Sequence, residues 1–162
     1  MTINAFQIHL LLNHIPLFAV LFAFITLLYG TIKKSEAVFP LARLFLWLGV
    51  ACTVTAFLSG DAAEEASEAL KVGFSEHYLE EHEEIAEAGL IIALVWGTID
   101  AAHFAVKKWF TAIYQNQAIK TFFKLEWALI ALWLVTLFIA AHQGGMIKHD
   151  EIRPAAAVDT AT

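Results

Sequence analysis

Three histidines, His14, His82 and His142, lie at the same end of three different apolar segments of the chain. An imidazole is costly to hold at membrane depth, and where one occurs there it commonly binds a metal, a haem or a proton. These three residues are therefore the predicted cofactor-binding and metal-binding residues of the protein.

The segments that must position these histidines are four apolar runs, residues 8–31, 38–59, 85–106 and 121–141. Hydrophobic residues make up 59% of the 162 positions, more than in ordinary soluble domains. Each run is close to the ~20 residues that a helix needs to cross the hydrocarbon core. The sequence predicts an all-α protein, an up-and-down bundle of four transmembrane helices, with one domain over residues 1–153 and a disordered tail over 154–162.

The basic residues predict how the bundle is oriented. Seven of the ten Lys and Arg residues flank the first and third connections: Lys33, Lys34, Arg43, Lys107, Lys108, Lys120 and Lys124. The middle connection, residues 60–84, carries nine acidic residues against Lys71 alone. By the positive-inside rule we expect a multi-pass protein of the bacterial inner membrane, with both termini and the acidic, partly helical connection outside.

A haem site is the first reading of the histidines. At ~100° per residue, the face of His82 continues through Ala86, Gly89 and Ala93, small residues against which a porphyrin can lie. The first and third spans are expected to be diagonal, so that His14 and His82 approach each other across the interior. We expect a b-type haem near the outer face, with His14 and His82 as axial ligands and His142 as an alternative ligand or propionate-side partner.

Two other readings remain open. The same three imidazoles with a carboxylate such as Asp61, Glu81 or Glu84 form a ligand set for zinc, copper or iron. Alternatively, the histidines only cap helices in a non-catalytic membrane subunit. In the leading interpretation the protein is an electron-transfer or respiratory accessory protein rather than a stand-alone enzyme.

Other polar residues are secondary candidates. Asp100 and Glu126 approach the basic end, where pairing with nearby lysines is the preferred interpretation; together with His103 they are the inner candidates for proton transfer. His77 points about 140° away from His82 on one helix and is a poor co-ligand. The role of His9 stays open.

The expected partners follow from composition. Membrane lipid is the first, and the acidic outer face suits a basic redox protein. A homo-oligomer or a larger complex is also compatible with the sequence. Nucleic-acid binding has no support, because the net charge is -6 and no basic stripe exists beyond the inner turns.

Four short motifs together resemble a widespread family of uncharacterised four-helix bacterial inner-membrane proteins. They are Asn13-His14-Ile15-Pro16, Leu58-Ser59-Gly60-Asp61, Glu81-His82-Glu83 and His142-Gln143-Gly144-Gly145. The chain departs from the family pattern at His9, which no proline follows, and at Ile15, where the family has phenylalanine. The resemblance implies the same four-helix fold and points to His14, His82 and His142, but it implies no function.

Overall fold

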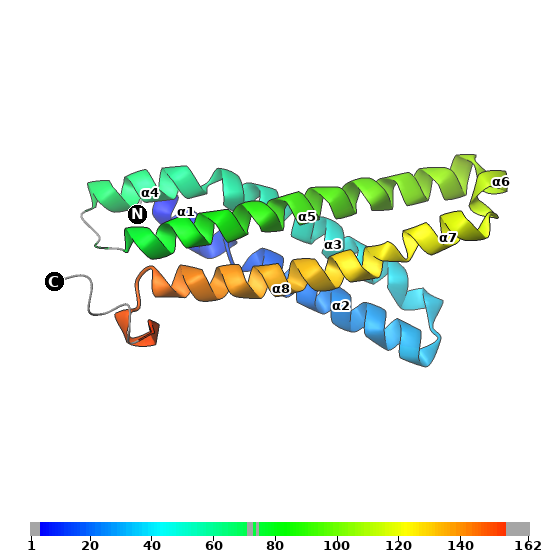
Figure 1. Cartoon of the computed structure of the whole chain (residues 1–162), viewed down its shortest axis with the longest axis horizontal. Coiled ribbons are helices and arrows are strands. Elements are labelled where there is room, and N and C mark those ends of the chain that lie inside the picture. The colour runs from blue at the N-terminus through cyan, green and yellow to red at the C-terminus, as the bar shows by residue number, and fades with distance from the viewer. Residues whose placement is uncertain (1–3, 71–72, 74, 155–162) are drawn as a thin grey trace.

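The computed structural model describes residues 4–70, 73 and 75–154, and this part of the chain is helical without a strand (Figure 1). The predicted tail therefore lies outside the described residues, apart from Pro154. In chain order the elements are α1 (Ala5–Leu12), α2 (Ile15–Lys33), η1 (Glu36–Val38), α3 (Phe39–Leu58), α4 (Gly60–Ala69), α5 (Glu76–Trp109), α6 (Thr111–Tyr114), α7 (Gln117–Phe123), α8 (Leu125–Met146) and η2 (Asp150–Ile152).

Four helical stretches are long and apolar enough to cross a membrane: Ala5–Lys33, Glu36–Ala69, Glu76–Trp109 and Leu125–Met146. The all-α prediction with four candidate spans is thus confirmed. The acidic connection is partly helical, because it contains α4 and the first turns of α5. We call the end of the bundle that carries α1, α4 and the start of α5 the acidic end, and the opposite end, with α6 and α7, the basic end (Figure 1).

The spans pack as a ring in which α2 contacts α3, α3 contacts α5, α5 contacts α8 and α8 contacts α2. This leaves α2 diagonal to α5, as expected from the sequence. Large side chains fill the centre. Trp133 is fully buried and crosses toward α3, where a Cβ at Gly49 would lie 3.1 Å from its ring. Glycine at this position therefore lets the indole occupy the middle of the bundle.

Two polar clusters lie toward the basic end. The Asp100 carboxylate, 3% exposed, accepts hydrogen bonds from Arg43 Nε at 2.7 Å and from Trp47 Nε1 at 3.0 Å. Glu126 pairs with His103 Nδ1 at 2.8 Å, and His103 Nε2 lies 3.2 Å from the Tyr114 hydroxyl. The partners of Asp100 and Glu126 are therefore an arginine, an indole and a histidine, and the predicted pairing with lysines is corrected.

The acidic end is opened by two breaks in the helices. α1 stops at Leu12, and α2 begins only after a turn at Asn13 and His14, because Pro16 sits in its first turn. α3 likewise gives way to α4 at Ser59. α1 packs on α4, yet in the described part of the chain no Cα of either comes within 8 Å of α5 or α8. At this end, α1 and α4 form one wall, and α5 and α8 form a second wall that is separate from it.

Candidate ligand-binding site

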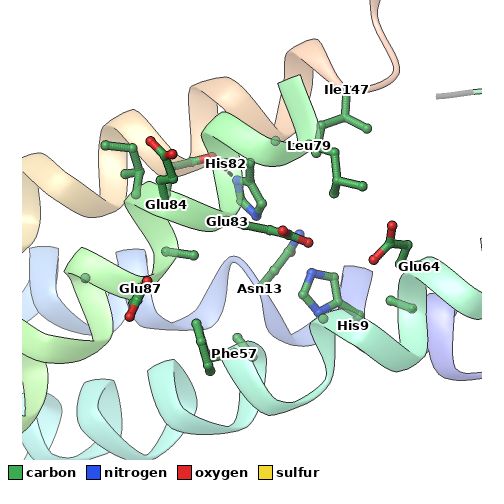
Figure 2. A pocket seen from close by; sticks show the side chains of 18 of the residues that line it. His9, Asn13, Phe57, Glu64, Leu79, His82, Glu83, Glu84, Glu87 and Ile147 are labelled. Atoms are coloured by element: carbon green, nitrogen blue, oxygen red, sulfur yellow. Dashed lines mark hydrogen bonds between the residues drawn. The ribbon is translucent and has the colours of Figure 1, made fainter. Parts of the chain in front are cut away.

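The space between these walls is a cavity of about 580 Å³ (Figure 2). α1, α3 and α4 line it on one side, and α5 and α8 on the other. Much of the lining is apolar: Phe6, Leu10, Phe57, Leu79, Ile85, Ala86, Gly89, Leu137 and Ala140. A cavity of this volume with apolar walls and a few polar groups is typical of sites for organic ligands.

His82 on α5 is held in one orientation by the end of α8. Its Nδ1 atom lies 2.9 Å from the carbonyl oxygen of Ala140. A carbonyl only accepts, so Nδ1 carries the proton and donates it. The ring also packs on Gly144, where a Cβ would lie 3.3 Å from His82 Cε1. In the neutral imidazole, Nε2 is therefore an unprotonated acceptor, and no described residue donates to it.

His9 on α1 is fixed in the same tautomer. Its Nδ1 atom lies 2.9 Å from Ser59 Oγ, and that hydroxyl donates its own proton to the carbonyl of Ala56 at 2.9 Å. Ser59 can then only accept from His9, which places the proton on Nδ1. His9 and His82 therefore present the same acceptor, Nε2, in one cavity whose lining includes both rings (Figure 2).

Thr53 on α3 differs from the other threonines of the spans. Five of these donate to the carbonyl four residues earlier, as threonine commonly does in an apolar helix: Thr26, Thr31, Thr55, Thr98 and Thr136. The Thr53 hydroxyl is buried, 6% exposed, lines the cavity and has no hydrogen-bond partner among the described residues. An orphaned hydroxyl in a cavity wall indicates a partner that arrives with a ligand or with water.

Asn13 supplies a second orphaned oxygen. Its Oδ1 atom is buried without a partner in the described part of the chain, and its side chain lines the cavity between α1 and α2. In the view of Figure 2 it lies between His9 and His82. Two imidazole nitrogens and two side-chain oxygens thus lack a hydrogen-bonding partner in one cavity.

The charge of the lining is strongly negative. Six carboxylates contribute to it: Asp61, Glu64, Glu80, Glu83, Glu84 and Glu87. Lys148 is the one lysine among the described lining residues, and its Nζ donates to the carbonyl of Gly73 at 2.6 Å. Most of these carboxylates are exposed, so they remain solvated at the rim. The site favours cations and hydrogen-bond donors over anions.

Of the three histidines predicted as ligands, the structure places only His82 in this cavity. His14 and His142 are exposed and do not line it, so the expected three-histidine cluster does not assemble. His77 is exposed and lies 3.6 Å from Glu81 Oε1. His9, whose role the sequence leaves open, also lines the cavity. The sequence feature that could have pointed to His9 is the helix break at Asn13-His14-Ile15-Pro16, which turns α1 away from the axis of α2.

The described residues hold no group of three or more His, Cys, Asp or Glu side chains that could coordinate a metal ion. Of the carboxylates considered as co-ligands, Asp61 and Glu84 line the cavity, while Glu81 accepts a hydrogen bond from Gln143 Nε2 at 3.3 Å. A zinc, copper or non-haem iron site at these positions stays a prediction.

Comparison of the chain with protein-family models, with curated proteins and with solved structures finds no match. The geometry of the cavity is therefore the basis for assigning a function.

Proposed function

We propose that the protein is a membrane-embedded binding protein, with a respiratory accessory role, for an apolar organic ligand that donates hydrogen bonds. The observation that carries this proposal is the set of acceptors without donors: His9 Nε2, His82 Nε2, Asn13 Oδ1 and the Thr53 oxygen. Asn13 Oδ1 and Thr53 Oγ1 are buried, and a buried acceptor left without a donor costs about 1–3 kcal/mol. A ligand that brings hydroxyl or protonated amine groups recovers this free energy.

The volume of the cavity and the charge of its lining favour this ligand over a metal ion or a haem. A cavity of about 580 Å³ is far larger than a bare metal ion requires. A haem carries two propionates, which would enter a lining with six carboxylates and one lysine. An apolar molecule with hydroxyl donors fits the volume, the walls and the charge together.

Haem b is the second candidate, because His9 and His82 both present Nε2 to one cavity and two axial ligands are enough for a haem. In this version His9 replaces His14 as the partner of His82, and Lys148 is the basic residue available to a propionate. The orientation proposed from the positive-inside rule places the cavity on the outer side of a bacterial inner membrane.

The test compares two probes of nearly the same shape. We expect the detergent-purified protein to bind naphthol about tenfold more tightly than naphthyl methyl ether, which lacks the donating proton, as measured by isothermal titration calorimetry. Equal affinity of the two probes would contradict the proposal. The absorption spectrum of the same preparation, oxidised and then reduced with dithionite, tests the haem candidate: a sharp reduced α-band lost in His9→Ala and His82→Ala would replace the first candidate by the second.

A further inference from the structure

A second, smaller cavity of about 290 Å³ lies between α4 and α5. We call it the acidic vestibule, because its lining is Glu64, Glu68, Glu76, Leu79, Glu80 and Glu83. Glu64, Leu79, Glu80 and Glu83 also line the larger cavity, so the two spaces adjoin. Most of the vestibule carboxylates are exposed, so solvent reaches the larger cavity past them.

The carboxylates of the vestibule have no cationic partner in the described part of the chain. The ion pairs that the described residues form are elsewhere, at Arg43, His77, His103 and His149. Lys148 lines the larger cavity but not the vestibule, and its Nζ is bonded to the carbonyl of Gly73. The vestibule therefore keeps its negative charge, which attracts cations and repels anions.

The larger cavity adds acceptors that a simple counter-ion would not need. The Thr53 side chain is 6% exposed and lines this cavity, and its hydroxyl has no hydrogen-bond partner among the described residues. Nε2 of His9 and of His82 accepts from a donor, since the proton of each ring is on Nδ1. A protonated primary amine carries both features that this arrangement favours, a positive charge and three N–H donors.

The walls of the larger cavity require that the amine be attached to an apolar group. Leu10 and Phe57 line it and are 49% and 38% exposed. α1 and α3, which carry these residues, belong to stretches long and apolar enough to span a membrane, so this side borders lipid when the helices are inserted. An apolar group beside Leu10 and Phe57 is thus covered by protein and by lipid together.

We infer that the ligand is an amphipathic organic cation, a protonated amine attached to an apolar ring or chain, which enters past the acidic vestibule. This inference rests on the proposed function and names its substrate class. An inorganic cation lacks the apolar group that the walls would cover. A neutral alcohol of the same shape gains nothing from the charge of the vestibule.

The experiment compares 1-naphthylmethylamine, which is positively charged at neutral pH, with the neutral 1-naphthylmethanol. Calorimetry measures the affinity of each for the full chain in an uncharged detergent. We expect the amine to bind about tenfold more tightly at low salt, because hydrogen bonds from a charged donor are stronger and the carboxylates add attraction. In about 0.5 M salt this advantage should fall several-fold, while the affinity of the alcohol stays the same.

Two neighbouring glutamates of α4 supply a matched pair of variants. Glu64 is half-buried and lines both cavities, whereas Glu65 is exposed and lines neither. Glu64→Gln keeps the shape of the side chain and removes its charge, so it should weaken binding of the amine about threefold and leave the alcohol unchanged. Glu65→Gln should change neither affinity at physiological salt, where its charge is screened.

The outcomes separate this inference from the proposed function. If the alcohol binds as tightly as the amine, the inference is wrong and the proposed function stands. The same conclusion follows if naphthol binds and the amine does not. If neither naphthol nor the amine binds, both are wrong. Equal losses of amine affinity in Glu64→Gln and Glu65→Gln, or a loss of alcohol affinity in Glu64→Gln, would contradict entry past the acidic vestibule.

Discussion

Replacing His82 by asparagine is expected to weaken naphthol binding about tenfold while leaving the fold intact. The asparagine amide nitrogen reaches the position of Nδ1 and keeps the hydrogen bond to the carbonyl of Ala140. It provides nothing at the position of Nε2, so the ligand loses one acceptor, about 1.4 kcal/mol. Calorimetry measures the affinity, and the unfolding temperature checks the fold.

Two controls make this result specific. His82→Gln extends an amide oxygen toward the former Nε2 position and is expected to recover part of the affinity. His14→Asn and His142→Asn change exposed rings outside the cavity and should bind naphthol like the unchanged protein. If His14→Asn or His142→Asn weakens binding as much as His82→Asn, the ligand does not bind in this cavity as proposed.

Replacing Arg43 by alanine is expected to lower the free energy of unfolding by about 3–5 kcal/mol, because it leaves a buried carboxylate without its cation. Asp100 is 3% exposed, and Trp47 Nε1 would remain as its one hydrogen-bond donor among the described residues. Asp100→Asn should cost less, about 1–2 kcal/mol, since it removes the buried charge and keeps an acceptor for Trp47, while the half-exposed Arg43 stays solvated.

The measurement is chemical unfolding in a fixed detergent, followed by tryptophan fluorescence. The structure predicts an order as well as a size: the arginine variant is the less stable of the two. Equal losses, or a larger loss in Asp100→Asn, would mean that the ion pair contributes stability as a pair and that desolvation of Asp100 is not the dominant cost.

The four candidate spans and the position of His82 were predictable because they depend on local rules. Long apolar runs must be helical in lipid, and the small residues Ala86 and Gly89 on the face of His82 marked a cavity wall that the structure contains. The helical character of the acidic connection likewise followed from its content of alanine and glutamate.

The partner of His82 was not predictable in the same way. The break near Pro16 was visible, but the direction in which α1 leaves it is decided by packing on α4 and by the bond from His9 to Ser59. Both are contacts between segments about 50 residues apart. The unpaired hydroxyl of Thr53 could not be predicted either. In the sequence Thr53 looks like the other threonines of the spans, and these all bond to a carbonyl of their own helix.

The proposed function requires that His9 and His82 present Nε2 acceptors to a donor ligand. Nitrogen NMR of the histidine-labelled protein tests it most directly. Without ligand, both residues should show the tautomer protonated at Nδ1. On addition of naphthol, the Nε2 resonances of His9 and His82 should shift as they accept a hydrogen bond, and those of His14 and His142 should stay unchanged. Shifts at His14 and His142, or protonation of His9 and His82 at Nε2 without ligand, would contradict this account.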